Sequence, residues 1–145
     1  MLAPEIGFTG TQEGMSEKQR SSLRQVLAGF FADGARVFRH GDCVGADAQA
    51  HAIAKAIGFR VVIHPPSDDS KRAFCQGDVV LTPRPYLLRN RHIVDASGVL
   101  IATPKGDEEL RSGTWSTVRY ARKVRRDFTI KIIAPQAGKS RGRIP

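Results

Sequence analysis

The sequence predicts an α/β protein built on a parallel sheet. Three observations support this fold class. Short apolar segments alternate with helix-like segments along the chain, most apolar segments run into a glycine or small-residue turn, and the connections are long enough for helical crossovers. Because such crossovers are right-handed, we expect a doubly wound, Rossmann-like sheet of five strands in the order 3-2-1-4-5, with helices on both faces.

The five strands are assigned to short apolar segments bounded by turn residues. They are residues 6–11, 35–40, 60–64, 99–102 and 129–133. The 145 residues are enough for one domain with its own core. We therefore expect a single Rossmann-like domain over residues 1–136, followed by a flexible basic tail over residues 137–145.

Helices are predicted between these strands. Ser16 and Gln19 have the spacing of a capping box, and apolar residues then recur at helical spacing up to Phe31. Further helices are predicted at residues 48–57, 86–96 and 114–126. No periodic pattern is visible from Ser67 to Pro85, so this stretch is predicted to be a surface loop that flanks a site.

Three small-residue turns follow predicted strands, at Gly10, at Gly41–Gly45 and at Ser112–Thr114. In a doubly wound sheet, ligands bind outside the carboxyl ends of the strands where the winding reverses, so these turns should meet in one crevice. The turn at residues 111–117 precedes a helix, whose first amides and dipole favour a phosphate group. The alternative is that Ser112 or Thr114 only caps the helix.

The composition limits the classes of function. No apolar run approaches ~20 residues, so we expect no membrane span, and residues 1–7 lack the features of a secretory signal. Cys43 and Cys75 do not form a disulfide framework or a paired zinc-site spacing, which favours a cytoplasmic protein without a bound metal. The formal net charge is +9, and basic residues gather late in the chain. Arg119, Arg122, Lys123 and Arg126 share one helical face, which is either a solvated face or a surface for an anionic partner.

Four motifs resemble the SLOG superfamily of Rossmann-like proteins. They are the TGT of residues 9–11, the GDxxGAD of residues 41–47, the YLLRN of residues 86–90 and the SGTW of residues 112–115. The superfamily includes the Lonely Guy (lysine-decarboxylase-like) nucleotide phosphoribohydrolases and DNA-processing protein A. The resemblance covers about residues 6–134 and implies a nucleotide-type ligand.

The Lonely Guy pattern can be compared residue by residue. Gly41 and Gly45 match its first glycine turn, Arg89 its arginine, and Gly113-Thr114 its Gly-Thr pair, whereas Asn90 stands in place of its lysine. Thr117 stands where the family has the glutamate implicated in cleaving the N-glycosidic bond. A threonine cannot supply that carboxylate, so the resemblance implies ligand binding more strongly than hydrolysis.

The predicted site contains phosphate-binding, base-reading and ribose-reading residues. Arg89 is expected to bind phosphate, Asn90 to read a base or ribose edge or to cap a turn, and Asp42 to accept from ribose hydroxyls or to cap a helix. The catalytic candidates are Arg89, Asp42 and Asp47, and Glu108 or Glu109 could replace the missing glutamate. The full set of expected ligand-binding residues is Gly10, Thr11, Gln12, Gly41, Asp42, Gly45, Arg89, Asn90, Ser112, Gly113, Thr114 and Thr117.

The expected function is the binding of a nucleotide or nucleotide-derived phosphate ligand, by a sensor or carrier with no other cofactor. One alternative is an N-glycosidase acting on nucleotides. A second is a nucleic-acid-binding protein that uses residues 119–126 and the basic tail. A homodimer is left open.

Overall fold

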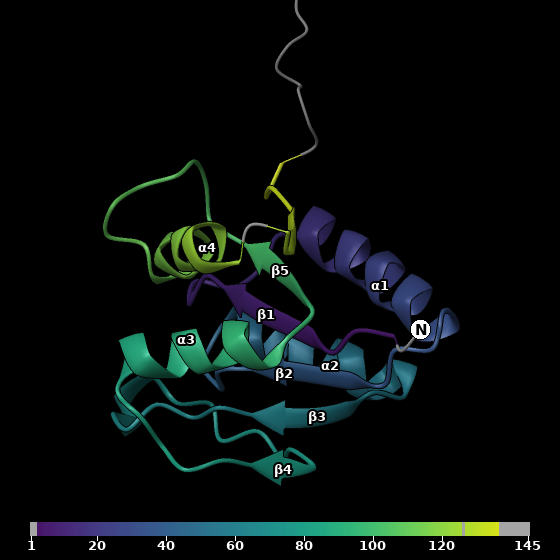
Figure 1. Cartoon of the computed structure of the whole chain (residues 1–145), viewed down its shortest axis with the longest axis horizontal. Helices are drawn as coiled ribbons and strands as arrows, with labels where there is room; N and C mark the ends of the chain where they lie inside the picture. The colour runs from purple at the N-terminus through teal and green to yellow at the C-terminus, as the bar shows by residue number, and fades with distance from the viewer. Residues whose placement is uncertain (1–2, 126, 137–145) are drawn as a thin grey trace, which may run out of the picture.

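In the computed structural model, which describes residues 3–125 and 127–136, a parallel sheet runs through the centre of the molecule (Figure 1). Its strands are β1 (Ile6–Gly10), β2 (Val37–His40), β3 (Arg60–Ile63), β4 (Val79–Val80), β5 (Val99–Thr103) and β6 (Thr129–Ile132). They pair in the order β4-β3-β2-β1-β5-β6, and every pair is parallel. The winding reverses between β1 and β5, as the sequence predicts.

The prediction of five strands is wrong, because the described part of the sheet has six. The additional strand, β4, lies within the stretch predicted to be a loop and pairs with β3 at the sheet edge through Val62 and Ile63. Two residues are too few to show a period of two in the sequence. The strand is held by β3 and by Asp78, whose carboxylate accepts a hydrogen bond from the Val61 amide at 2.7 Å. The remaining five strands keep the predicted order.

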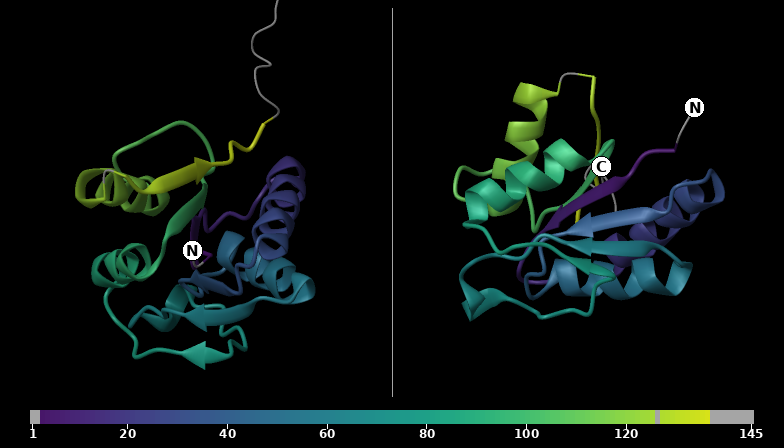
Figure 2. Two further views of the ribbon diagram at one scale, coloured as in Figure 1. Left: turned by 45° about the vertical axis from the view of Figure 1, so that its right-hand side comes forward. Right: turned by 60° about the horizontal axis from the view of Figure 1, so that its bottom comes forward.

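Helices cover both faces of the sheet. Helices α1 (Glu17–Ala32) and α2 (Ala46–Ile57) lie on one face, and α3 (Tyr86–Ala96) and α4 (Gly113–Val124) lie on the other (Figure 2). A short 3-10 turn, η1 (Asp69–Lys71), precedes β4. The larger core fills the space under α1 and α2 around Phe8, Phe38 and Leu27, and a smaller core under α3 and α4 includes Leu100 and Trp115. Trp115 is therefore a core residue, and its indole donates to the Gly106 carbonyl at 3.2 Å.

Helix starts follow the local chemistry. The capping box before α1 is confirmed: Ser16 Oγ accepts from the Gln19 amide at 3.1 Å, and Gln19 Oε1 accepts from the Ser16 amide at 3.0 Å. Helix α2 begins at Ala46, two residues before the predicted start, because Gly45 has a φ of 89° and turns the chain directly into the helix. The fourth helix ends at Val124 rather than Arg126. Within the described chain, no helix has the length and apolar character needed to cross a membrane.

The predicted basic tail, residues 137–145, lies outside the described residues. Its flexibility therefore stays a prediction. Residue 126 of the predicted basic face also lies outside them.

Candidate functional site

A cleft of about 710 Å³ opens at the carboxyl ends of the strands. This volume lies within the usual range of roughly 300–1,000 Å³ for small-ligand sites. The cleft is bounded by the turns after β1, β2 and β5, by one face of α3 and by the loop that contains η1. It thus lies where the winding of the sheet reverses, the position expected for a ligand in this topology.

Nine residues of the expected binding set line this cleft, and they come from three separate turns and from α3. They are Gly10, Thr11, Gln12, Gly41, Arg89, Asn90, Ser112, Gly113 and Thr114. Glycine at position 41 also has a structural role, because a Cβ at this position would overlap the guanidinium of Arg89. Glycine there leaves room for the Arg89 guanidinium against the β2 turn.

Three residues of the expected set do not line the cleft. Asp42 is fully buried, and its carboxylate accepts from Arg72 Nε at 2.8 Å and from the Cys75 amide at 2.9 Å, which ties the β2 turn to the loop before β4. Gly45 packs against the Gln12 carbonyl, where a Cβ would overlap it. Thr117 Oγ1 donates to the Gly113 carbonyl at 3.0 Å inside α4. The Asp42 and Thr117 side chains are thus bonded within the protein, and Gly45 is needed for close packing.

Arg89 is buried, and most of its hydrogen-bonding capacity is used internally. Its Nη1 donates to the carbonyls of Gly41 and, at 3.1 Å, His64, while Nε donates to Asn90 Oδ1 at 2.7 Å and Nη2 contacts Cys43 Sγ at 3.6 Å. A guanidinium has five N–H groups, so four of them have acceptors among the described residues and one has none. Arg89 joins β2, β3 and α3 beneath the cleft.

Asp47 lies in the first turn of α2 and contributes a buried carboxylate to the cleft lining. Its Oδ2 accepts from the Cys43 amide at 3.1 Å, whereas Oδ1 is buried without a hydrogen-bond partner among the described residues. Burial raises the pKa of Asp47 to about 6, an effect that the nearby charge of Arg89 opposes. At neutral pH the side chain is therefore a buried carboxylate with one oxygen that has no hydrogen-bond partner among the described residues.

The start of α4 presents free backbone donors. Ser112 Oγ caps the helix by accepting from the Trp115 amide at 3.1 Å, and the Ser112 carbonyl accepts from the Ser116 amide. The amides of Gly113 and Thr114 come before the first intrahelical bond, and neither has an acceptor in the described chain. A Cβ at Gly113 would meet no atom within 4 Å, so the space beside it is open. Ser112 is therefore a helix cap and two amides remain free, while phosphate binding at this turn stays a prediction.

The sequence reasoning missed several cleft residues, namely Asp68, Ser70, Lys71, Tyr86, Lys105 and Arg111. Most lie in irregular loops, where no periodicity predicts which side chains turn inward. Tyr86 could have been found, because it lies three residues before Arg89 and seven before Ile93, which share its helical face. Lys105 at the cleft forms an ion pair with Glu13 at 3.2 Å.

Ion pairs partly neutralise the charged residues in the loop before α4 and along the helix. Glu108 pairs with Arg119 at 3.1 Å and with Arg122 at 3.3 Å, so it faces α4, whereas Glu109 lines the cleft. Arg119 also donates to the carbonyls of Glu109 and Leu110. Half of the predicted basic face therefore holds the loop before α4 in place.

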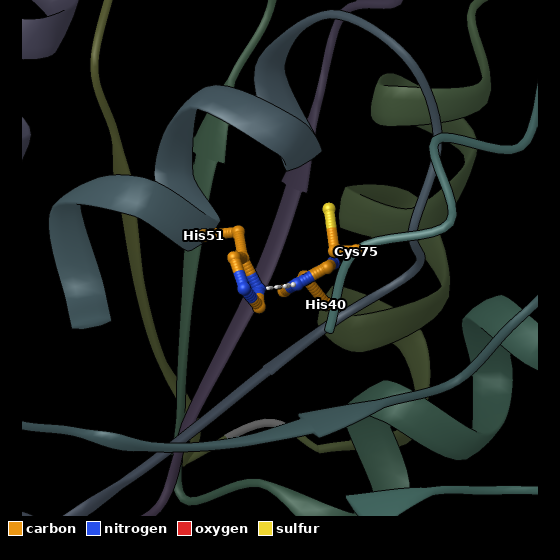
Figure 3. A group of neighbouring side chains, drawn as sticks. All are labelled: His40, His51 and Cys75. Atoms are coloured by element: carbon orange, nitrogen blue, oxygen red, sulfur yellow. Dashed lines mark hydrogen bonds between the residues drawn. The ribbon is translucent and has the colours of Figure 1, made fainter. Parts of the chain in front are cut away.

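A second cluster of chemically active side chains contains His40, His51 and Cys75, whose possible ligand atoms all lie within 4.8 Å of one another (Figure 3). His40 Nδ1 accepts from the Asp42 amide at 2.9 Å, which places the proton of the neutral ring on Nε2. That Nε2–H then donates to His51 Nδ1 at 3.0 Å. Burial, with His51 nearby, lowers the pKa of His40 to about 3, so the ring stays neutral.

This cluster is a hydrogen-bonded network rather than a fit to a metal ion. A metal on His40 Nε2 would require a proton on Nδ1, which would then face the Asp42 N–H. Burial and a hydrogen bond to Asp42 raise the pKa of the Cys75 thiol to about 12, which disfavours the thiolate that a metal needs. The network connects β2, α2 and the loop before β4 behind the cleft.

Comparisons with known proteins give the fold. No family model matches the chain, and no curated protein matches it. A solved structure, that of the molybdenum cofactor binding protein from the phototrophic bacterium Rippkaea orientalis, is similar with a TM-score of 0.70 and 23% sequence identity. The similarity covers 94% of this chain and 79% of that protein. At this level of identity the two proteins share their α/β fold, with a parallel sheet between layers of helices.

Proposed function

We propose that this protein binds a nucleotide or nucleotide-derived phosphate ligand in the cleft and acts as a sensor or carrier. The observation that carries the proposal is the start of α4, where the Gly113 and Thr114 amides are free and open space lies beside Gly113. Free amides at a helix start bind anions through hydrogen bonds and the helix dipole. Lys105 and Arg111 line the same end of the cleft and add positive charge. The resemblance to the SLOG superfamily supports the same ligand class.

The Gly113 amide can be tested with a matched pair of variants. Gly113 is the first residue of α4, and Ser112 before it has extended backbone (φ −83°, ψ 126°), which suits a following proline. Gly113→Pro therefore removes one N–H while keeping the helix start, and Gly113→Ala adds a Cβ but keeps the N–H. We expect nucleoside monophosphates to bind Gly113→Pro about tenfold or more weaker than Gly113→Ala, the effect of one hydrogen bond to a charged group.

Affinities are measured by calorimetry with AMP, GMP, IMP and inorganic phosphate, after a thermal-shift screen. The molybdenum cofactor belongs in the screen, because the protein from Rippkaea orientalis that shares the fold binds it. Equal affinity of the two Gly113 variants would contradict a phosphate at the start of α4. A wild-type protein that binds none of these molecules would contradict the proposed function itself.

An N-glycosidase would release free base from nucleotides, and we expect little such release. The resemblance puts Thr117 at the position of the family's glutamate, and Thr117 Oγ1 is held by the Gly113 carbonyl inside α4. Glu109 and Glu13 line the cleft, so carboxylates are present at its rim. Incubation with AMP, GMP and IMP, followed by chromatography, should show release of free base far below ~1 s⁻¹, the low end of ordinary enzymes. Faster release that is lost in Glu109→Gln would favour the enzyme.

A further inference from the structure

Two buried side-chain oxygens lack a hydrogen-bond partner among the described residues, Asp47 Oδ1 and Thr103 Oγ1. Of the two residues, Asp47 lines the cleft. Leaving a buried charged oxygen without a donor is costly, so proteins pair almost all such atoms. The Asp47 side chain is only 5% exposed, and the fold already supplies a donor to Oδ2. A ligand group in the cleft is the natural donor for Oδ1.

The surroundings of Asp47 differ from those of the start of α4, where we propose that the phosphate binds. Asp47 lies beside Cys43, which contacts Arg89, and Tyr86 lies over the Arg89 guanidinium with 5.3 Å between the guanidinium carbon and the ring centre. Tyr86 also lines the cleft and offers an aromatic surface. This end therefore combines an aromatic ring, a carboxylate oxygen and the remaining N–H of Arg89. Such a combination suits a flat heterocycle rather than a phosphate.

We propose that Asp47 selects a ligand whose ring carries two adjacent N–H donors, the 2-amino-4-oxo edge of a guanine-type base. The inference rests on the proposed function, because a phosphate bound at the start of α4 would place the ring of the ligand beside Asp47. A carboxylate only accepts hydrogen bonds, so it can accept from the ring N–H and the exocyclic amino group. Oδ1 is free, and Oδ2 keeps a second lone pair beside the Cys43 amide.

The same geometry disfavours adenine and cytosine. Beside its amino group, each of these bases has a ring nitrogen that accepts, and this lone pair would face the carboxylate. The oxo group of a guanine-type ring accepts a hydrogen bond, and the remaining N–H of Arg89 can donate to it. Sites built around a buried polar group discriminate strongly against ligands that leave it unpaired.

The test compares GMP, IMP and AMP on the full chain by calorimetry. IMP has the ring N–H but lacks the exocyclic amino group. We expect GMP to bind at least about tenfold tighter than AMP, with IMP between them. Asp47→Asn keeps the shape of the side chain but replaces one acceptor by a donor, and it should remove the preference for GMP. Asp68→Asn is the matched control, because Asp68 also lines the cleft but its Oδ1 already accepts from the Ser70 amide.

The outcomes separate the two proposals. Equal binding of GMP and AMP to the wild type, or an unchanged GMP preference in Asp47→Asn, overturns the role of Asp47 and leaves the phosphate site standing. Loss of the preference in Asp68→Asn alone would assign ring selection to the other carboxylate and also overturn it. Failure of all three monophosphates to bind overturns the proposed function, and this inference with it. Because the wild-type comparison needs no variant, a folding defect cannot hide the result.

Discussion

Replacing Arg89 with alanine is expected to lower the free energy of unfolding by about 3–5 kcal/mol, even without any ligand. The loss has two physical causes. The carbonyls of Gly41 and His64 would lose their buried donor, and the buried carboxylate of Asp47 would lose the nearest positive charge. Urea unfolding followed by circular dichroism measures the change.

A control for this substitution exists on the same helix. Arg91 is exposed and lies over the Tyr120 ring at 5.2 Å, so Arg91→Ala should change stability by less than about 1 kcal/mol. If Arg89→Ala unfolded like the wild type and only lost ligand affinity, Arg89 would be a ligand residue, as the resemblance alone suggests. A large loss of stability would instead show that the arginine builds the cleft from below.

Asp47→Asn is expected to stabilise the protein near neutral pH by about 2–3 kcal/mol, with an effect that vanishes in acid. Burial raises the pKa of Asp47 from 3.8 to about 6 in the folded state. Between these two values the folded state binds more protons than the unfolded state, so the free energy of unfolding falls as the pH rises through this window. The advantage of the asparagine should therefore grow from pH 4 to pH 6 and stay constant above it.

Burial is the largest cause of this pKa shift, and the groups that face Asp47 modify it. Arg89 and the amides of Cys43 and Gly41 favour the carboxylate, while Asp42 disfavours it. The measurement is the difference in unfolding free energy between variant and wild type at several pH values, which cancels the other titrating groups. A difference that does not depend on pH would contradict the assigned pKa. Asp68→Asn should instead lose stability relative to the wild type as the pH rises, because the hydrogen bond from Ser70 lowers the pKa of Asp68 in the folded state.

The sequence by itself determined the fold class, the order of five strands and the three turns that meet at the cleft. These features depend on local signals, such as the capping box at Ser16 and Gln19 and the glycines after β1 and β2, together with the right-handed crossover rule. A strand of two residues carries no such signal. The position of β4 was therefore decided by its pairing with β3.

The tertiary structure decided which polar side chains face the cleft and which hold the fold. Asp42, Arg89 and Thr117 are all polar residues, and the sequence places each in the binding set. Asp42 instead accepts from Arg72, thirty positions away, and Arg89 lines the cleft but also donates to Gly41, forty-eight positions away. Asp47 accepts from the Cys43 amide through Oδ2, while Oδ1 has no partner among the described residues. A hydrogen bond between distant residues leaves no pattern in the sequence, because its geometry exists only after the sheet and helices have packed.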